Sequence, residues 1–385
     1  MRAAPEGKPC AYCSTQEHRI PPNLEMPPTC KYHLFLSHVW RSGQDKTHII
    51  ARTLQMYLPR LLIWLDVDNL DDMGRLEEYI AESAVFFIFY SEGYFRSVNC
   101  RREFYQAVLL DKPIIVVYEG DVSVVGEMKE ECAKYCTDGF LLEVGSLQEI
   151  LTKDPIQLLK GGYFSAETLK LVYMHLLGNL PFYKDIDKKQ MLDKGLQMPN
   201  EISSVALSSS IQLLICEENA GVCDLAIEIQ SQFPDKIIKM KTLQGAESMQ
   251  GDIGDNNPIS RLETGFDDDD ITMLEQISID LAVQKQILLL YLNKDTFCDG
   301  ENGITEALKV AKHKGIGIIL VHEQDIDKGG CPFNYFFDHA PQWLIDCPYR
   351  IFEGVAVPLY SRDEYRMVSL RLILQQMEAA GKTNL

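Results

Sequence analysis

The sequence predicts an α/β protein in which helices cover both faces of a parallel sheet. Two observations support this prediction. Four apolar runs of strand length, each bounded by polar or turn-forming residues, follow one another at Tyr32–Ser37, Leu61–Asp66, Ala84–Tyr90 and Pro113–Tyr118. The stretches between them place apolar residues at helical spacing. Apolar strands that alternate with helices are typical of a doubly wound sheet, whose two faces are both buried.

Each interval between these strands contains a helical pattern. The apolar positions are Ile49, Ile50, Leu54 and Leu58 in the first interval, Leu76, Tyr79 and Ile80 in the second, and Phe104, Val108 and Leu109 in the third. Further along, Gly120–Tyr135 and Ala166–Leu177 are predicted to be helices, and Phe140–Val144 is predicted to be a fifth strand. We therefore expect a five-stranded sheet in the first half of the chain.

The second half repeats this plan at a spacing of about two hundred residues, which suits a duplicated domain. Its strands are predicted at Ile211–Ile215, Ile237–Met240, Ile287–Tyr291 and Gly317–Val321. The segment Ile287–Phe297 resembles Phe86–Phe95. Similarly, Gly317–Glu323 resembles Pro113–Glu119. The sequence thus predicts the same fold twice in tandem.

Length and charge limit the class of protein. At 385 residues the chain is too long for one ordinary core, and the stretch 179–200 mixes proline with charge, as expected of a joint between domains. We predict a leader over residues 1–27, one domain over 28–200 and another over 201–385. The formal net charge of −19 argues against binding nucleic acid or an anionic membrane surface. No run has the length of a membrane span, so we expect a soluble cytoplasmic protein.

The amino-terminal cysteines raise the question of a metal site. Cys10 and Cys13 form a Cys-x-x-Cys pair, and Cys30 with His33 follows, so four zinc ligands are available. However, His33 lies at the start of the first predicted strand, and proline pairs at 21–22 and 27–28 indicate a stiff, irregular arm. We therefore expect a leader that binds no metal.

Ligands of a doubly wound sheet bind beyond the carboxyl ends of its strands, so the loops that leave those ends form the candidate site. The first loop is predicted at Ser37–Asp45, and the second runs from Asp66 to Gly74. The third is Ser91–Cys100, and it leads into a helix that contains Glu103 in its first turns. These three polar loops and one carboxylate should meet at one edge of the sheet.

The residues along this edge resemble the successive motifs of Toll/interleukin-1 receptor (TIR) domains. The matching positions are Phe35–His38, Trp64–Asp66 with Leu70 and Gly74, Ser83, Ser91 with Tyr94, and Ser97 with Cys100 and Glu103. The order and spacing of these motifs carry the resemblance, because no single motif is specific. The family implies a flavodoxin-like five-stranded parallel sheet for residues 28–200 and a degenerate TIR-like domain for residues 201–385.

TIR domains either cleave the nicotinamide–ribose bond of NAD+ or only assemble. In the enzymes a glutamate at the start of the third helix is required, and Glu103 has this position, so the resemblance implies that Glu103 is catalytic. Breaking the N-glycosidic bond builds positive charge on the ribose, which a fixed carboxylate stabilises without a metal or a cofactor. From the residues alone, Glu103 could instead be a solvated helix residue paired with Arg96, Arg101 or Arg102.

The candidate substrate-binding residues are His38, Trp40, Arg41, Asp66, Tyr94, Phe95 and Asn99. Arg41 could meet the pyrophosphate, and Trp40 could either stack on an aromatic ring or pack its own loop. His38 suits an orienting role, whereas Asp66 could bond a ribose or anchor its loop.

Asn99 is a departure from the family, because the enzymes usually have tryptophan four residues before the glutamate. A stacking surface would have to come from Trp40, Tyr94 or Phe95. Acyl-hydrolase and phosphate-loop chemistry is excluded more simply, since the sequence has neither Gly-x-Ser-x-Gly nor Gly-x-x-x-x-Gly-Lys-Ser/Thr.

TIR enzymes act as assemblies through the loop after the second strand, which here contains Asp68, Leu70 and Gly74. The resemblance therefore implies a cytoplasmic protein of stress or innate immune signalling that hydrolyses NAD+ to nicotinamide and an ADP-ribose product. Its partners would be NAD+ and other TIR domains, including copies of itself. The alternative is a non-catalytic scaffold that acts through TIR–TIR association.

Overall fold

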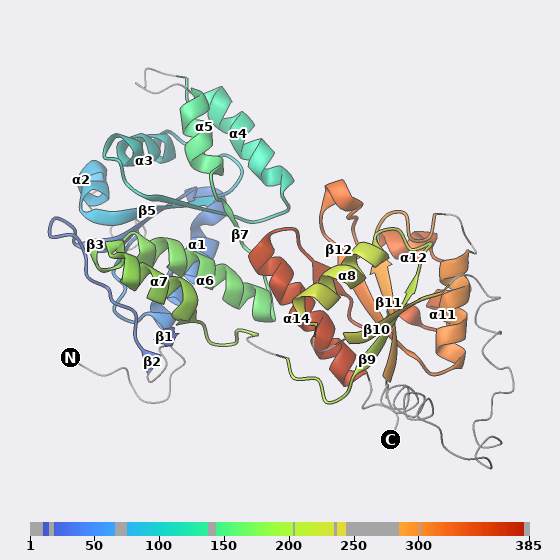
Figure 1. The fold of residues 1–385 in the computed structure, drawn as a ribbon. Helices are drawn as coiled ribbons and strands as arrows, with labels where there is room; N and C mark the ends of the chain where they lie inside the picture. Colours follow the sequence, from blue (N-terminus) through green and yellow to red (C-terminus); the bar gives the residue numbers. More distant parts are fainter. Residues whose placement is uncertain are drawn as a thin grey trace, which may run out of the picture. The chain divides into compact units, whose positions relative to one another are not determined.

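The computed structural model describes residues 11–14, 19–65, 75–137, 144–202, 205–234, 237–243, 285–298, 300 and 302–380. The chain divides into two compact units, Met1–Glu201 and Ile202–Leu385, which we call the first and the second unit. Each unit contains one five-stranded parallel sheet covered by helices (Figure 1). The predicted α/β class and the parallel arrangement of the strands are thereby confirmed.

The sheet of the first unit has the strand order β4-β3-β5-β6-β7, and every neighbouring pair is parallel. The strands are β3 (Tyr32–His38), β4 (Ile63–Trp64), β5 (Ser83–Tyr90), β6 (Ile114–Tyr118) and β7 (Ile156–Gln157). Numbered along the chain, the order is 2-1-3-4-5, as in flavodoxin-like folds. All eight residues of the central strand β5 are buried, which explains its unbroken apolar run.

The fifth strand differs from the prediction. It is Ile156–Gln157, which pairs with the end of β6, whereas the prediction placed it at Phe140–Val144. Residues 138–143 lie outside the described residues, and Val144 begins helix α5 (Val144–Thr152). Its two residues stand in no continuous apolar run, because Pro155 precedes them and Gln157 is polar, so the pattern that indicated the other strands is absent here.

Helices cover both faces of this sheet. On one face lie α2 (Leu76–Ala81), α3 (Val98–Leu109), α4 (Ser123–Tyr135) and α5, whose buried side chains share a core with Phe35, Phe86 and Ile88 of the strands. On the other lie α1 (Trp40–Tyr57) and α6 (Gly162–Gly178), where the Tyr173 hydroxyl donates to the carbonyl oxygen of Leu54 at 2.6 Å (Figure 1).

The amino-terminal stretch and the expected joint both fold as parts of the first unit. Strands β1 (Tyr12–Ser14) and β2 (Arg19–Ile20), within the expected leader, form an antiparallel sheet with β8 (Leu196–Gln197). The expected joint contains the 3-10 helix η3 (Pro181–Lys184) and helix α7 (Ile186–Gly195). Pro181 stands at the start of η3, where a missing N–H breaks no hydrogen bond, so proline here does not signal a linker.

The second unit repeats the strand order of the first. Its sheet runs β10-β9-β11-β12-β13, again 2-1-3-4-5 along the chain and parallel throughout. The strands are β9 (Ile211–Cys216), β10 (Ile237–Leu243), β11 (Lys285–Leu292), β12 (Gly317–Glu323) and β13 (Val357–Leu359). The first four include the four predicted strands of this half.

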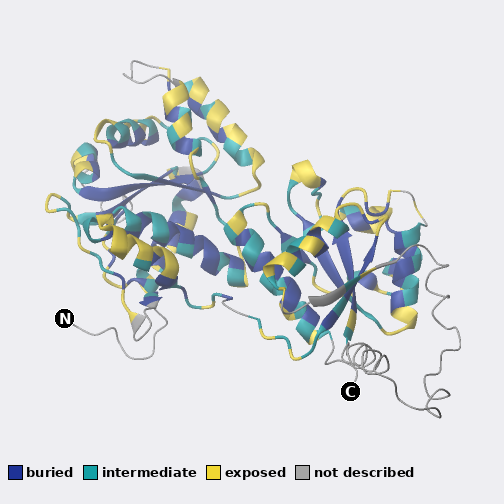
Figure 2. Ribbon diagram, viewed as in Figure 1, coloured by how far each residue is buried: buried dark blue, intermediate teal, exposed yellow. Residues whose placement is uncertain are grey.

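One face of the second sheet packs against α8 (Val222–Gln232) and α14 (Asp363–Ala379). The other packs against α11 (Gly303–His313), α12 (Tyr335–His339) and α13 (Gln342–Ile345), with the 3-10 helix η6 (Ile351–Glu353) alongside. The 3-10 helix η5 (Ile326–Lys328) follows β12. In both units the described strands are mostly buried and the helices expose one side (Figure 2).

Within the described ranges, no helix has both the length and the apolar character needed to span a membrane.

Candidate functional site

Glu103 is positioned by the start of helix α3. Ser97 caps this helix: its side chain accepts a hydrogen bond from the backbone N–H of Cys100 at 3.3 Å. Beginning the helix at Val98 directs Cys100, Glu103, Phe104 and Ala107 toward the sheet, at the spacing of one buried helix face. Glu103 is only 6 % exposed, so its carboxylate lies inside the protein rather than on a solvated helix surface.

Two hydroxyl groups organise this carboxylate. Ser37, near the carboxyl end of β3, donates a hydrogen bond to Oε2 of Glu103 at 2.5 Å, and the hydroxyl oxygen of Tyr94 lies 2.6 Å from Ser37 Oγ. A serine hydroxyl has one proton, which here goes to Glu103, so Tyr94 must donate to Ser37. All three residues are buried. We call them the Ser37–Tyr94–Glu103 cluster.

The protonation of Tyr94 supports this direction of donation. Burial raises the pKa of the Tyr94 hydroxyl well above its usual range, and Cys100 and Glu103 raise it further. Tyr94 therefore keeps its proton at neutral pH and remains a donor. The cluster delivers a hydrogen bond to one carboxylate oxygen of Glu103 from a chain of two neutral hydroxyls.

The cluster lies where a sheet of this order binds ligands. Strands β3 and β5 are neighbours, and the chain moves to opposite sides of β3 as it builds the sheet, so the crevice beyond their carboxyl ends is a topological switch point. Ser37 comes from β3, and Tyr94 comes from the loop that follows β5. A carboxylate at this place, removed from water, acts strongly on any positive charge that forms nearby.

The first loop is shorter than predicted. Strand β3 continues through His38, and helix α1 begins at Trp40, so most of the predicted loop Ser37–Asp45 is helical. His38 is buried, and its carbonyl oxygen accepts from Cys100 Sγ at 3.3 Å, which links β3 to α3. Trp40 is 43 % exposed at the first turn of α1. The backbone of Arg41 follows in that turn, and its side chain lies outside the described residues.

The aromatic residues of the third loop are buried. Phe95 is fully buried, with its ring centroid 5.0 Å from that of Tyr94 and 5.6 Å from that of Phe104. A side chain with no accessible face packs the core and offers no surface for a ligand ring. Asn99, in the first turn of α3, is exposed. Among the three aromatic candidates for stacking, Trp40 alone has an exposed ring in this part of the described chain.

The predicted residues of the second loop, Asp66, Asp68, Leu70 and Gly74, lie outside the described residues.

The arginines that the sequence offered as partners of Glu103 make other contacts. Arg102 pairs with Glu77 at 2.5 Å, and Arg101 donates to the carbonyl oxygens of Phe95 and Arg96.

Three residues at the same edge were not anticipated. Glu119 follows β6, and its carboxylate pairs with Lys46 of α1 and with Lys160. These two lysines hold the pKa of Glu119 below its usual range. The signal available in the sequence was an acidic residue directly after the fourth strand. The edge therefore carries two ammonium groups in addition to the buried carboxylate.

The amino-terminal residues considered as zinc ligands do not form a metal site in the part of the chain that the structure describes. Cys10 lies outside it, and His33 uses both ring nitrogens on backbone groups, with Leu62 N–H donating to Nδ1 and Nε2 contacting the carbonyl oxygen of Leu24. No group of three or more His, Cys, Asp or Glu side chains within the described ranges could hold a metal ion.

At the carboxyl ends of the strands in the second unit, the polar side chains are hydrogen-bonded to backbone groups of the same unit. The Glu218 carboxylate accepts from the N–H of Gly303 at 2.7 Å, at the start of α11, and a Cβ on Gly303 would collide with it. Asn219 bonds both backbone groups of Tyr291, at 2.7 and 2.8 Å. Glu306, near the place that Glu103 has in the first unit, contacts Lys309 at 3.4 Å and is partly exposed.

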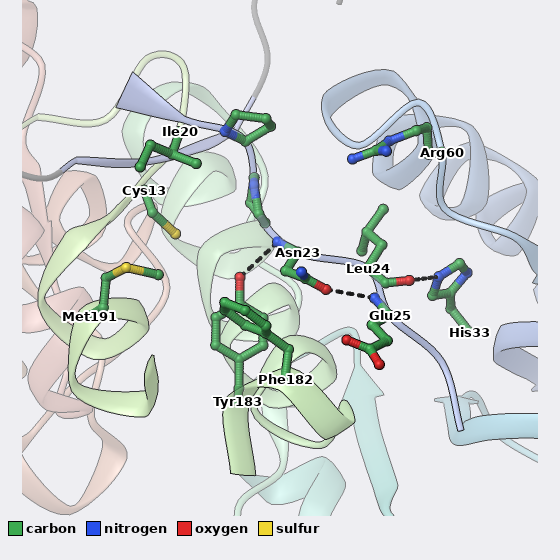
Figure 3. Close-up of a pocket in the computed structure, with 12 residues that line it drawn as sticks. Cys13, Ile20, Asn23, Leu24, Glu25, His33, Arg60, Phe182, Tyr183 and Met191 are labelled. Atoms are coloured by element: carbon green, nitrogen blue, oxygen red, sulfur yellow. Dashed lines mark hydrogen bonds between the residues drawn. The ribbon is translucent and has the colours of Figure 1, made fainter. Parts of the chain in front are cut away.

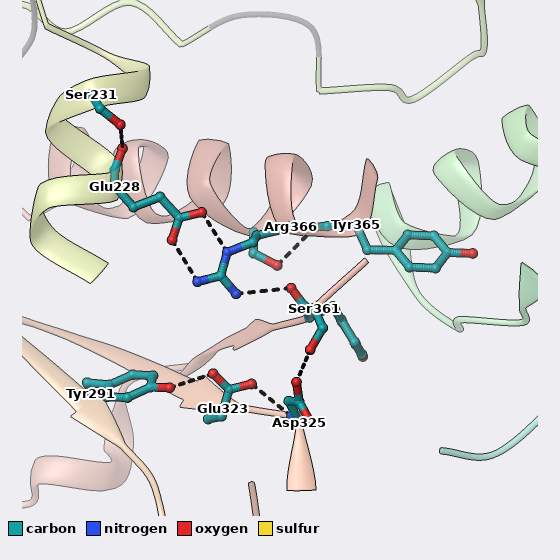
Figure 4. Close-up of polar contacts among 10 residues, drawn as sticks. Glu228, Ser231, Tyr291, Glu323, Asp325, Ser361, Tyr365 and Arg366 are labelled. Carbon is teal, nitrogen blue, oxygen red and sulfur yellow. Dashed lines mark hydrogen bonds and ion pairs between the residues drawn. The ribbon is translucent and has the colours of Figure 1, made fainter. Parts of the chain in front are cut away.

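A second set of polar contacts in this unit joins strand to strand and helix to helix (Figure 4). Glu323, at the end of β12, is fully buried; it accepts from the Tyr291 hydroxyl at 2.5 Å and from the N–H of Asp325 at 2.8 Å. Beside it, Arg366 of α14 binds Glu228 of α8 through two bonds of 2.6 Å. Every one of these groups is bonded to another part of the unit, which suits a structural role.

Two cavities in the first unit, of about 500 and 590 Å³, are lined by described residues that do not belong to the Ser37–Tyr94–Glu103 cluster.

Neither a scan of protein-family models nor a search of curated proteins gave a match to this chain. The function must therefore be inferred from the residues and geometry of the site itself.

Proposed function

We propose that the chain is a TIR-like signalling protein that cleaves NAD+ to nicotinamide and an ADP-ribose product. The observation that supports this most directly is the placement of Glu103. Its carboxylate is buried at the switch point of a 2-1-3-4-5 parallel sheet and is oriented by a hydroxyl group from the neighbouring strand. A glutamate that served only solubility would gain nothing from this placement.

The chemistry requires little more than this carboxylate. The bond between ribose C1′ and the nicotinamide nitrogen breaks, the electron pair leaves with the nitrogen, and positive charge develops on the ribose. Glu103 stabilises that charge, and its effect is large because the site is removed from bulk water. Water then adds to C1′ and releases a proton, which completes the hydrolysis. Ser37 and Tyr94 hold the carboxylate in one orientation throughout.

Lys46 and Lys160 suit the remainder of the substrate. Both ammonium groups lie at the carboxyl edge of the sheet, where they share the carboxylate of Glu119. A pyrophosphate that approached this edge would meet two ammonium groups whose charge exceeds that of the one carboxylate they share, in an otherwise acidic protein. We propose that these lysines, with Trp40 on the same edge, contribute to binding of the dinucleotide.

The second unit is proposed to be a degenerate copy of the first. A tyrosine lies near the end of each third strand (Tyr90 and Tyr291), and a glutamate ends or follows each fourth strand (Glu119 and Glu323). The strand order is also shared. The second copy has no buried carboxylate like that of Glu103 among the described residues of α11, so the reaction is assigned to the first unit.

The test is nicotinamide release by concentrated full-length protein incubated with NAD+. The substitution Glu103→Gln preserves the size of the side chain and its ability to accept from Ser37 but removes the negative charge. We expect turnover to fall by about 10²–10³-fold, the range found when one transition-state electrostatic contact is removed. Glu78→Gln, on the exposed side of α2, is the matched control and should leave turnover unchanged.

Circular dichroism and thermal unfolding should show that both variants fold. Equal turnover by Glu103→Gln and the parent protein would remove Glu103 from the mechanism. A parent protein that releases no nicotinamide at any concentration would contradict the enzymatic proposal and leave the second candidate.

That second candidate is a non-catalytic scaffold that associates through TIR-like surfaces. Helix α3 supports it: Val98 and Leu109 are 61 % and 57 % exposed and, at eleven residues apart, lie on one side of the helix. On this proposal Leu109→Lys abolishes self-association in sedimentation experiments, whereas Glu103→Gln does not. Unchanged association of Leu109→Lys would remove this helix face from the assembly.

A further inference from the structure

A cavity of about 500 Å³ lies in the first unit near the amino end of β3, at the opposite edge of the sheet from Glu103 (Figure 3). Ile20, Leu24, Phe182, Tyr183 and Met191 give it mainly apolar walls. The size and composition are those of pockets that bind small molecules, which are largely apolar with a few placed polar groups.

The wall formed by residues 23–25 is held in place before any ligand arrives. The N–H of Asn23 donates to the Tyr183 hydroxyl at 2.9 Å, and the N–H of Glu25 donates to Asn23 Oδ1 at 2.8 Å. Between them, the carbonyl oxygen of Leu24 lies 3.1 Å from Nε2 of His33. A pocket with fixed walls loses little conformational entropy when it binds, so its shape selects its ligand.

Three polar groups of this cavity are left without partners. Arg60 and Glu25 both line it, yet neither side chain forms an ion pair or hydrogen bond with any residue that the structure describes. The side-chain nitrogen of Asn23 likewise donates to none of the described residues. By contrast, both ring nitrogens of His33 bond to backbone groups, and the Tyr183 hydroxyl oxygen accepts from the N–H of Asn23.

The charges that remain are one guanidinium and one carboxylate among the described lining residues. His33 adds no charge at neutral pH, because burial lowers its pKa. A purely anionic ligand would bring Glu25 close to a like charge, and a purely cationic one would do the same to Arg60. A ligand with both charges satisfies both side chains.

We propose that this cavity binds a small zwitterion with an apolar body, the chemistry of a hydrophobic α-amino acid. Its carboxylate is bound by the planar fork of Arg60 and by the amide of Asn23, and its ammonium group by Glu25. Its side chain packs against Phe182, Met191 and Ile20. The site lies across the sheet from the proposed NAD+ site, so this ligand does not compete with the dinucleotide.

The experiment titrates L-phenylalanine, L-leucine and L-methionine into full-length protein labelled at the methionine methyl groups. Met191 lines the cavity, and its methyl resonance is assigned by Met191→Leu. We expect at least one of the three amino acids to shift this resonance saturably. For L-phenylalanine as that ligand, the analogues are 3-phenylpropionate, which lacks the ammonium group, and phenethylamine, which lacks the carboxylate. Each should bind about tenfold more weakly, since a hydrogen bond to a charged group is lost.

Arg60→Gln and Glu25→Gln should each weaken binding about tenfold for the same reason. Both residues are exposed, so the variants retain the fold. Arg52→Gln, on α1 and outside the cavity, is the matched control and should bind like the parent protein. Absence of a saturable Met191 shift with all three amino acids would overturn the proposal. So would equal binding of 3-phenylpropionate, or equal affinity in both cavity variants.

Discussion

His33 shows how one buried side chain constrains the start of a strand. Its Nδ1 accepts from Leu62 N–H at 2.9 Å, which leaves the proton on Nε2 to bond the carbonyl oxygen of Leu24 at 3.1 Å. The ring therefore joins the connection before β4 and the wall of the cavity to β3. A second proton on the ring would face the donor N–H of Leu62, so the arrangement requires the neutral form.

This arrangement predicts a pH dependence. Burial lowers the pKa of His33, so the unfolded chain takes up the proton first as the pH falls. The stability that neutral His33 contributes is fully present above the unfolded pKa of about 6.5 and is lost as the pH falls toward the folded value. We expect the free energy of unfolding to decrease between pH 7.5 and 5.5, and to decrease less in His33→Gln.

Thermal and urea unfolding across this pH range provide the measurement. An identical slope in His33→Gln would show that His33 does not titrate with folding.

At the scale of elements, a bidentate ion pair joins α8 to α14 in the second unit. Arg366 meets Glu228 through two parallel bonds, with 18 % and 28 % of the two side chains exposed. Lysine at position 366 would keep the charge but not the paired geometry. Because the pair is partly buried, we expect Arg366→Lys to cost about 1–2 kcal/mol, between the values for exposed and buried ion pairs.

A double-mutant cycle with Glu228→Gln, followed by urea unfolding, measures the coupling between the two side chains. Arg362→Lys is the control, because its pair with Glu364 joins residues two positions apart at the start of α14 and is more exposed. That change should stay within about 0.5 kcal/mol. A coupling energy near zero for Arg366 and Glu228 would mean that apolar packing alone holds α8 to α14.

At the scale of the whole molecule, each unit has its own core and its own sheet. We therefore predict that residues 1–201 and 202–385 each fold as separate fragments with one cooperative thermal transition. Circular dichroism and calorimetry of the two fragments provide the measurement. A fragment without a cooperative transition would contradict this division.

A shorter fragment, 1–178, sharpens the test of where the first unit ends. It lacks η3, α7 and β8, and with them the partner strand of β1 and the Tyr183 hydroxyl that binds Asn23. We expect it to melt at a lower temperature than 1–201. Equal melting temperatures of the two fragments would show that residues 179–200 do not stabilise the first unit and act as a linker.

The elements that the sequence predicted correctly are those that lie in a continuous apolar run or repeat apolar residues at helical spacing. Strands such as β5 and β11 produce apolar runs of strand length, and helices such as α3 repeat their apolar residues every three or four positions, so both were located correctly. Strands β7, β8 and β13 have two or three residues, and a proline or a polar residue interrupts the apolar run around each of them, whereas the equally short β4 lies within a continuous apolar run.

For the candidate site, local pattern placed Glu103 near the start of a helix and Ser37 at the end of a strand. It could not show that Tyr94, Ser37 and Glu103 are joined, because the bonds connect positions 57 and 66 residues apart. It also left Phe95 open as a ligand surface, and tertiary packing buries that ring completely.

The amino acid order by itself determined the α/β class, the parallel strands and the place of the buried glutamate on its helix, because these follow from hydrophobic spacing along a few turns or strands. Only the tertiary structure decided that residues 12 and 197 share a sheet, that two lysines meet Glu119, and that Arg60 and Glu25 line one cavity. Such contacts join residues far apart in the chain, and their energies depend on burial and distance that no local pattern contains.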